Sequence, residues 1–293
     1  MLKYFDTPIF EISTSASQMA GLRVIVKRED SNHPSVSGNK WWKLKYNLES
    51  AKREGQGTLL TFGGAYSNHI YATAAAAKEL GFKSIGIIRG EAALPLNPTL
   101  SFAKECGMNL HFLSREDYRK KSEVSFAENL RAKFGDFYLI PEGGSNSLAV
   151  KGCVEFAKEK LSSVDFDYLC LATGTGGTLA GIIEGLDGKQ NVIGFSVLKN
   201  GDFLNEEVRG YLEHSGKEYS NWNIQTGFHF GGYAKQTPEL NQFILEMKQH
   251  HHLPLDPIYT GKMTAGVFDL MKKNYFARGS TILLIHTGGL RPV

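Results

Sequence analysis

Short apolar runs alternate with longer amphipathic runs along most of this chain. The apolar runs carry apolar residues at consecutive positions and are bounded by turn residues, as are strands that are covered on both faces in a parallel sheet. The amphipathic runs predict helices, such as the alanine-rich run at 72–80, which ends at the common helix-stop residue Gly81. We predict strands at residues 58–62, 84–88, 109–113, 138–140, 168–172, 192–197 and 281–285, and an extended stretch at 22–30.

This alternation predicts the α/β fold class, with open, twisted, mainly parallel sheets flanked by helices. The 293 residues are enough for about two domains, although composition alone marks no boundary between them. In open parallel sheets, ligands bind beyond the carboxyl ends of the strands, in the loops that lead into helices. The chemistry of this chain is therefore expected in its strand-to-helix loops.

Charge and composition argue against several classes of function for this protein, including nucleic-acid binding. The net charge is +3 without a long basic run, so nucleic acid is not expected as a partner. No apolar run approaches the roughly 18 residues of a membrane span, and we expect no signal peptide. The three cysteines are widely spaced, which indicates a reduced, cytoplasmic protein. Three adjacent histidines at 250–252 follow a polar helical run without other ligand residues, so we expect a solvated turn and no metal site.

Lys40 is the first candidate for covalent chemistry. It follows small and polar residues at 37–39 and stands at the start of an amphipathic run. A lysine that is held in place and partly desolvated loses its proton near neutral pH, and a neutral amine forms Schiff bases with aldehydes. That is the chemistry of pyridoxal phosphate. The alternative for Lys40 is a solvated surface lysine beside a turn.

Two strand-to-helix loops offer donors for an anion. In the first, residues 63–69, two glycines precede Ser67, Asn68 and His69 near a predicted helix N-terminus, where the helix dipole favours anions; helix capping is the alternative. In the second, glycines let several backbone N–H groups converge on one phosphate, and hydroxyl groups add donors. The loop lacks the Lys-Ser/Thr pair of a Walker nucleotide-binding loop and the third glycine of the dinucleotide-binding motif. A monophosphate is therefore the better match as its ligand. This second loop consists of Thr173, Gly174, Thr175, Gly176, Gly177 and Thr178.

Two later segments, 256–262 and 285–289, follow extended apolar stretches. Hydroxyl groups at strand ends can form a hydrogen bond with the ring nitrogen of a cofactor. A neutral hydroxyl would not enforce protonation of that nitrogen as a carboxylate would. For Tyr259, the alternative is packing in the core with its hydroxyl satisfied.

Together these segments resemble the pyridoxal-phosphate enzymes of fold type II, the tryptophan synthase β group. More closely, they resemble the 1-aminocyclopropane-1-carboxylate deaminase and D-cysteine desulfhydrase family. The family's Gly-Asn-Lys motif matches 38–40, its Ser-Asn-His/Gln loop matches 67–69, and its Pro-Glu-Gly-Gly-Ser-Asn segment is complete at 141–146. Its glycine-rich loop matches 173–178 and its Asp-Pro-Val-Tyr-x-Gly-Lys motif matches 256–262. The motifs keep the family's order over nearly the whole chain.

The resemblance implies pyridoxal 5'-phosphate as the cofactor and a role for each matching residue. Lys40 would hold the cofactor as a Schiff base and move the Cα proton of the substrate. Asn68 would contact the phenolic oxygen of the cofactor, the loop at 173–178 would hold its phosphate, and Thr287 would meet its pyridine nitrogen. On the substrate side, Ser67 would bind the carboxylate or assist proton transfer. Two tyrosines, Tyr259 and Tyr233, would line that side.

Some positions depart from the family pattern. Thr260 and Thr287 stand where the deaminases proper carry glutamate and leucine, and with His69 they resemble the desulfhydrase type. Four aromatic residues replace the family's usual ones and are expected to surround the substrate pocket, which leaves the substrate open. They are Trp41, Trp42, Tyr66 and Tyr71. For the two tryptophans themselves we expect packing or an interface.

The resemblance implies a pyridoxal-phosphate-dependent lyase or deaminase that acts on a small amino acid. The first expectation is β-elimination from D-cysteine, giving a 2-keto acid, ammonia and sulfide. Ring-opening deamination of 1-aminocyclopropane-1-carboxylate is the alternative, and a protein that binds a phosphate ligand without covalent chemistry is a third. The resemblance also implies a homodimer, with a smaller α/β domain at 44–142 and a larger cofactor-binding domain formed by 1–43 and 143–293.

Overall fold

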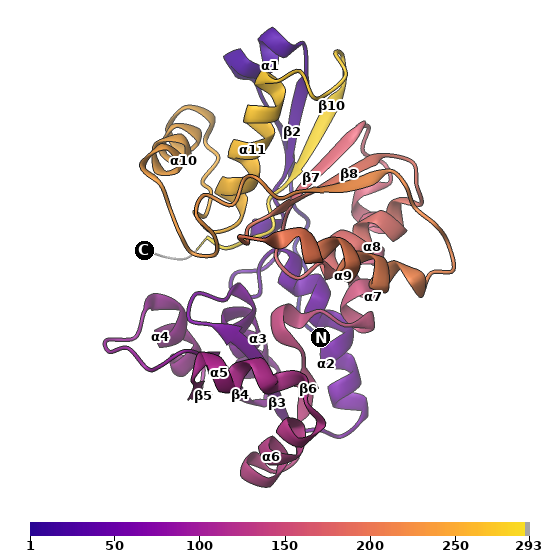
Figure 1. Cartoon of the computed structure of the whole chain (residues 1–293). Coiled ribbons are helices and arrows are strands. Elements are labelled where there is room, and N and C mark those ends of the chain that lie inside the picture. The colour runs from indigo at the N-terminus through magenta and orange to yellow at the C-terminus, as the bar shows by residue number, and fades with distance from the viewer. Residues whose placement is uncertain (291–293) are drawn as a thin grey trace.

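Two mainly parallel sheets with helices packed around them form the two halves of the molecule (Figure 1). The structure, a computed structural model, describes residues 1–290. The larger sheet has six strands in the order β1-β2-β10-β7-β8-β9, and the smaller sheet has four in the order β5-β4-β3-β6. Within the described residues, every strand pairing is parallel except that of β1 with β2. The fold class predicted from the sequence is therefore confirmed.

The strands of the larger sheet come from both ends of the chain, whereas those of the smaller sheet come from one continuous stretch. The larger sheet contains β1 (Ile9–Ile12), β2 (Arg23–Lys27), β7 (Tyr168–Thr173), β8 (Asn191–Ser196), β9 (Trp222–Gln225) and β10 (Thr281–Ile285). The smaller sheet contains β3 (Thr58–Gly64), β4 (Lys83–Arg89), β5 (Met108–Leu113) and β6 (Tyr138–Ile140). All four of these lie inside 44–142, and the exact division into domains stays a prediction.

Eleven α-helices lie in the described part of the chain. They are α1 (Ser15–Ala20), α2 (Asn39–Arg53), α3 (Asn68–Leu80), α4 (Pro98–Glu105), α5 (Arg115–Arg119), α6 (Val124–Phe134), α7 (Ser147–Phe156), α8 (Gly177–Leu186), α9 (Leu204–Glu213), α10 (Pro238–His251) and α11 (Thr260–Lys272). No helix among these is long and apolar enough to cross a membrane.

Alternate residues of the central strands pack to opposite faces of the larger sheet. Leu169 and Leu283 belong to the core shared with α2, α7 and α8, whereas Cys170 and Leu284 belong to the core shared with α10 and α11. Because both faces are covered, these strands read as continuous apolar runs in the sequence. The first of these cores also includes Leu59 of the smaller sheet, so apolar packing continues from one half into the other.

The seven strands predicted from the sequence are confirmed, with bounds that agree to within two residues. Helix α3 ends where predicted, at Gly81, which adopts the left-handed conformation with φ 77°. The edge strands β1 and β9 were not predicted, because they are short and only partly buried and so lack a continuous apolar run. His250 and His251 are the last residues of α10 and only His252, its left-handed cap, lies outside the helix, so the expected solvated turn is confirmed only in part.

Candidate active site

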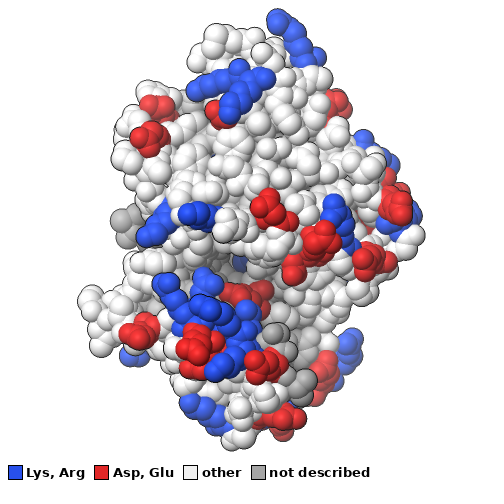
Figure 2. All heavy atoms as spheres, viewed as in Figure 1, with Lys and Arg blue, Asp and Glu red and all other residues white. Residues whose placement is uncertain are grey.

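Two connected cavities lie where loops of both halves meet. The inner cavity has a volume of about 60 Å³ and the outer one about 480 Å³, and Ser67, Gly143, Gly174, Thr175 and Tyr259 line both. Figure 2 shows the corresponding hollow across the middle of the molecule. The inner cavity brings together residues from every loop singled out in the sequence except that of Tyr233, which lines the outer cavity. Its polar lining includes Lys40, Asn68, Thr173, Thr178 and Thr287.

Lys40 lies in the first turn of α2 and points into the inner cavity, as its position in the lining requires. Gly38, the residue before the helix, has φ 70°, and a Cβ there would lie 2.0 Å from the carbonyl oxygen of Thr287. Only glycine fits this close approach between the lysine loop and the loop after β10. The Gly38 N–H donates to Asn32 Oδ1 (2.9 Å), and Asn32 Nδ2 donates to the Gly38 carbonyl (3.0 Å). Asn32 thereby fixes both the N–H and the carbonyl of Gly38, two residues before Lys40.

Desolvation lowers the pKa of Lys40 to about 8, from an ordinary value of 10.5. Roughly one amine in ten is then neutral at pH 7, compared with well under one in a thousand for an ordinary lysine. A pKa near 8 suits the Lys40 amine to Schiff-base formation, and this role of Lys40 stays a prediction.

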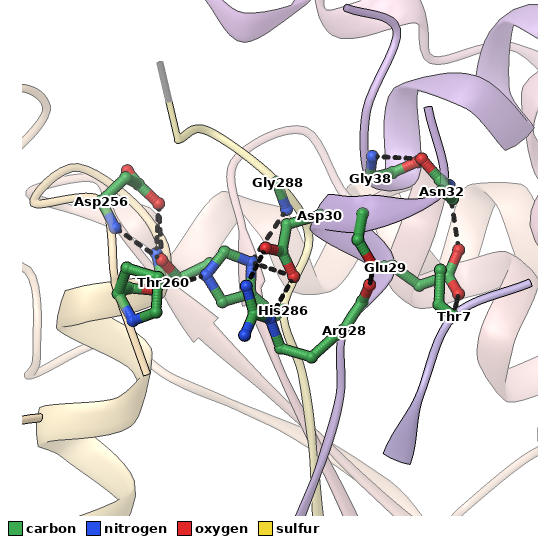
Figure 3. A network of polar contacts seen from close by, with 12 residues as sticks. Thr7, Arg28, Glu29, Asp30, Asn32, Gly38, Asp256, Thr260, His286 and Gly288 are labelled. Carbon is green, nitrogen blue, oxygen red and sulfur yellow. Dashed lines mark hydrogen bonds and ion pairs between the residues drawn. The ribbon is translucent and has the colours of Figure 1, made fainter. Parts of the chain in front are cut away.

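The buried carboxylate of Glu29 stabilises the turn that precedes Lys40 (Figure 3). Glu29, 1% exposed, accepts hydrogen bonds from Thr7 Oγ1 (2.6 Å), Asn32 Nδ2 (3.0 Å) and Trp42 Nε1 (2.9 Å). Asn32 in turn holds Gly38, so a chain of hydrogen bonds runs from Trp42 to the loop that precedes Lys40. This role of Glu29 could not be predicted from the sequence, because Thr7 and Trp42 lie 22 and 13 residues away along the chain.

A second buried network fixes the loop that carries Thr287 (Figure 3). His286, 1% exposed, lies 3.2 Å from Asp30 Oδ1 through Nδ1 and 2.9 Å from the Pro254 carbonyl through Nε2. Asp30 also pairs with Arg28 at 2.6 Å. The end of β2, the loop after β10 and the segment before α11 are therefore tied together directly behind the cavity.

The loop at 173–178 forms a cup at the N-terminus of α8. Its cap residue Gly176 has φ 74° and offers no side-chain hydrogen bond, so the first backbone N–H groups of the helix are not capped by a side chain. Asn39 Nδ2 donates to Thr178 Oγ1 (2.8 Å), which joins this cup to the lysine helix. A phosphate fits such a cup, because the N–H groups and the positive end of the helix dipole face one point.

Lys43 is a site residue whose role the sequence did not reveal. It is 1% exposed, lines the inner cavity, and donates to Ser145 Oγ (2.6 Å), which lies 2.6 Å from Thr175 Oγ1. Among the described residues it forms no ion pair. Burial, followed by the nearby Lys40, holds the pKa of Lys43 well below its ordinary value. An anion in the cup would supply the missing counter-charge, so the donor set fits a phosphate-bearing cofactor.

Ser67 and His69 occupy the N-terminus of α3. Ser67 caps the helix by accepting from the backbone N–H groups of His69 (3.2 Å) and Ile70 (3.3 Å), and its hydroxyl remains in the wall of both cavities. His69 lies within 2.7 Å of Thr61 Oγ1 through Nε2. Since Thr61 donates to the Ile140 carbonyl (2.8 Å), Nε2 carries the proton, and burial together with Lys40 and Lys43 lowers the pKa of His69. A neutral imidazole therefore lies beside the cavity.

The motif at 256–262 brings two tyrosines together. Asp256 accepts from the backbone N–H groups of Tyr259 (2.8 Å) and Thr260 (2.9 Å), which fixes the start of α11. Lys262, fully buried, donates to the carbonyls of His229 (2.9 Å) and Gly232 (2.7 Å) and so holds the loop that carries Tyr233. The hydroxyls of Tyr233 and Tyr259 lie 3.5 Å apart. The segment before Asp256 is a loop and not a strand, so the expected strand end applies only to 285–289.

The four departures from the family pattern do not surround the pocket as expected. Trp41 and Trp42 are buried in the core with their rings 4.8 Å apart, Tyr71 stacks on Phe102 at 3.8 Å, and Tyr66 is half exposed. None of the four lines either cavity. For Trp41 and Trp42 the expectation failed because helical periodicity turns these neighbours of Lys40 away from it and into the core. Packing of the tryptophans is confirmed.

The described residues contain no group of three or more His, Cys, Asp or Glu side chains that could hold a metal ion. The side chains that line the inner cavity include hydroxyl, amide, imidazole and ammonium groups.

Comparison with known proteins identifies what the chain is similar to. The family described as "Pyridoxal-phosphate dependent enzyme" matches residues 1–288. A putative 1-aminocyclopropane-1-carboxylate deaminase of Pyrococcus abyssi is 32% identical over 98% of this chain and 90% of that protein. The D-cysteine desulfhydrase of Klebsiella pneumoniae is 29% identical over 97% and 91%. The crystal structure of an ACC deaminase homologue superposes with a TM-score of 0.86 at 30% identity, covering 99% of this chain and 91% of the other.

Proposed function

The chain belongs to the pyridoxal-phosphate dependent enzyme family, and we propose that it catalyses β-elimination from a small amino acid of the D-cysteine type. Pyridoxal phosphate is its cofactor. The observation that carries the proposal is the placement of Lys40. This amine, with its pKa lowered to about 8, lines a cavity whose other wall is an anion cup.

Each side of the inner cavity has a task in this proposal. The bound cofactor supplies the aldehyde that captures an amine and the ring that delocalises charge from Cα. Lys43 and the loop at 173–178 would hold its phosphate. Asn68 would contact its phenolic oxygen, and the hydroxyl of Thr287 would meet its ring nitrogen without enforcing protonation.

The substrate would lie between Ser67 and the tyrosine pair. The Ser67 hydroxyl and the dipole of α3 would bind its carboxylate, and the Lys40 amine would take the Cα proton. The hydroxyls of Tyr259 and Tyr233 would lie on the substrate side, where a proton can pass to the departing sulfur. In the balanced reaction the Cα–H and Cβ–S bonds break. One cysteine and one water then give hydrogen sulfide, pyruvate and ammonium.

The test is keto acid and sulfide release by purified protein supplied with D-cysteine. Lys40→Ala should abolish a visible absorption band of the protein and reduce turnover by roughly 10²–10⁴-fold or more, the range for loss of a positioned acid–base group. No turnover of D-cysteine would defeat the desulfhydrase proposal. The cofactor assignment is read separately, from the absorption band.

Ring-opening deamination of 1-aminocyclopropane-1-carboxylate is the alternative, because relatives with about the same identity carry that name. It needs an acid or nucleophile on the ring, since that substrate has no Cα hydrogen. Thr260, which stands where the resemblance would place a glutamate, is fully buried and hydrogen-bonded to Asp256 at 2.7 Å. We therefore rank this reaction second. Release of 2-oxobutanoate in preference to pyruvate, measured with both substrates, would reverse the order.

We also propose a homodimer in the cytoplasm, with a smaller domain at 44–142 and a larger domain formed by 1–43 and 143–293. Light scattering during size-exclusion chromatography would test the dimer. A monomer with full activity would contradict that part.

A further inference from the structure

The outer cavity gives the site space beyond the inner cavity that Lys40 lines. Ligand sites commonly have volumes of about 300–1,000 Å³, and the outer cavity alone has about 480 Å³ while the reactive lysine lies in the inner one. It opens directly beyond Ser67 and the tyrosine pair. A group attached to the β-carbon of a substrate would extend into this space.

Two cations line the outer cavity, Arg89 and Lys121, and Arg89 is the one without an ion pair among the described residues. It is the last residue of β4, exposed, and pairs in register with Gly64 of β3, three residues before Ser67. Its guanidinium lies over the Tyr118 ring at 5.8 Å and forms no hydrogen bond or ion pair with the side chains that the structure describes. A guanidinium with its fork of donors unused is suited to bind a carboxylate in a bidentate way.

The guanidinium of Arg89 lies beside the backbone of Gly64, across from Tyr233. A Cβ on Gly64 would lie 3.7 Å from Arg89 Nη2 and 3.8 Å from Tyr233 Cε1, so both side chains flank this bare stretch of backbone. Arg89 belongs to the smaller sheet and Tyr233 to the larger half. Arg89 and Tyr233 therefore bring the two halves together in the wall of the outer cavity.

The other charges of the cavity do not neutralise Arg89. Lys121 pairs with Glu142 at 3.2 Å, so these two largely compensate each other. The remaining acid, Glu207, comes from α9 and has its Cβ near Gly176 of the phosphate cup, on a different wall. Figure 2 shows Lys and Arg side chains gathered along the lower edge of the hollow. The cavity thus has a cationic side, formed by the smaller half.

We propose that the outer cavity is a subsite for an anionic group on the β-substituent of the substrate, and that Arg89 binds this group. The inference rests on the proposed function and names its substrate class. The substrate would be an amino acid whose leaving group carries a carboxylate or similar anion beyond the bond that breaks. In the elimination, the Cα–H and Cβ–S bonds break, the leaving group departs as the thiol, and water converts the three-carbon remainder to pyruvate and ammonium.

The experiment compares two ligands of the same shape. S-carboxymethylcysteine carries the anion, and S-carbamoylmethylcysteine carries a neutral amide in its place. Both enantiomers are titrated into the cofactor-loaded protein by rapid mixing, and binding is read from the cofactor absorption band. We expect the wild-type protein to bind one enantiomer of the anionic ligand about tenfold more tightly than its amide, as befits a charged hydrogen bond.

Three variants make the comparison specific. Arg89→Gln should bring the two dissociation constants to within about twofold, and Arg89→Lys should keep part of the preference, because it retains charge without the planar fork. Arg119→Gln, an equal change of charge on the exposed helix α5, should keep the full preference. Loss of the preference in Arg119→Gln would show a long-range field and overturn the proposal. So would an unchanged preference in Arg89→Gln.

The outcomes separate this inference from the proposed function. If D-cysteine is not turned over but the charge preference depends on Arg89, the function fails and the subsite stands. If D-cysteine is turned over and the wild-type protein shows no charge preference, the subsite fails and the function stands.

Discussion

The lowered pKa of Lys40 gives the site a pH dependence at the level of one residue. The amine attacks an aldehyde only when it is neutral, and its neutral fraction rises with pH until the pKa of about 8 is passed. The rate of cofactor capture by the cofactor-free protein should therefore rise about tenfold per pH unit below 7 and level off above about 8. Stopped-flow absorbance over pH 6–10 measures this. A rate that still climbs between pH 9 and 10 would show an ordinary lysine.

We expect Lys43 to contribute more to the affinity for the cofactor than to the rate of the catalysed reaction. A buried ammonium without a carboxylate partner is unfavourable in the empty protein and favourable beside a phosphate. Lys43→Met should weaken cofactor binding by roughly 1.5–3 kcal/mol, or about ten- to hundredfold in dissociation constant, while the cofactor-free protein unfolds at the same or a higher temperature. Lys52→Met, an exposed lysine on the same helix, is the control. Equal affinities for the two variants would remove Lys43 from the phosphate site.

Lys43 also makes the affinity for the cofactor depend on pH. Its pKa is well below the ordinary value in the empty site, and a neighbouring phosphate raises it. The bound state therefore holds more protons than the free state, and the contribution of Lys43 to affinity falls as pH rises. Proton uptake on cofactor binding should be measurable by calorimetry in two buffers of different ionisation enthalpy, and it should be smaller in Lys43→Met.

At the scale of elements, the turn before α2 depends on one glycine. Gly38→Ala combines a left-handed backbone with a contact of 2.0 Å to the Thr287 carbonyl, so we expect a loss of about 2–5 kcal/mol in the free energy of unfolding. Gly55→Ala is a matched control, because Gly55 has nearly the same φ and nothing within 4 Å of its would-be Cβ. It should lose only about 1 kcal/mol. Urea unfolding of both variants measures these losses in the free energy of unfolding. Equal losses would mean that the structure around the Thr287 carbonyl adjusts easily to the added Cβ.

The loop of Tyr233 depends on helix α11 through Lys262. The Lys262 ammonium donates to two carbonyls of that loop, at 2.9 and 2.7 Å. Lys262→Met should leave the fold intact but speed amide hydrogen exchange at residues 229–233 by at least tenfold, since a charged hydrogen bond contributes about 1.5–3 kcal/mol. Lys272→Met, at the exposed end of the same helix, should leave amide hydrogen exchange at residues 229–233 unchanged. Unchanged exchange in the first variant would show that other contacts hold the loop.

The local elements could be predicted from sequence, because their determinants are local. Apolar runs marked the covered strands, and glycines and hydroxyl residues after strands marked the loops that line the cavity. The roles of Glu29, Lys43 and Lys262 could not be predicted in this way. Their partners lie up to about a hundred residues away, and only packing of the two halves brings them together. Trp42 shows the converse error, because nearness to Lys40 in sequence suggested nearness in the pocket.

At the scale of the whole molecule, the site is built from both halves. Ser67 and Asn68 come from the smaller half, and Lys40, Thr287 and the loop at 173–178 come from the helix and loops that meet it. A cofactor bound there makes contacts on both sides of the hollow. Any ligand that binds only the folded protein stabilises it, by about 2.7 kcal/mol when present at a hundredfold excess over its dissociation constant.

The cofactor should therefore raise the midpoint of thermal unfolding by on the order of 5 °C or more at such an excess, and protect both halves together. Amide hydrogen exchange should slow in the loop at 64–70 of the smaller half and in the loop at 173–178 of the larger half at the same cofactor concentration. Lys43→Met should need a higher concentration for the same protection, because its cup lacks the ammonium. Protection confined to 173–178 would mean that the cofactor is held by the larger half alone.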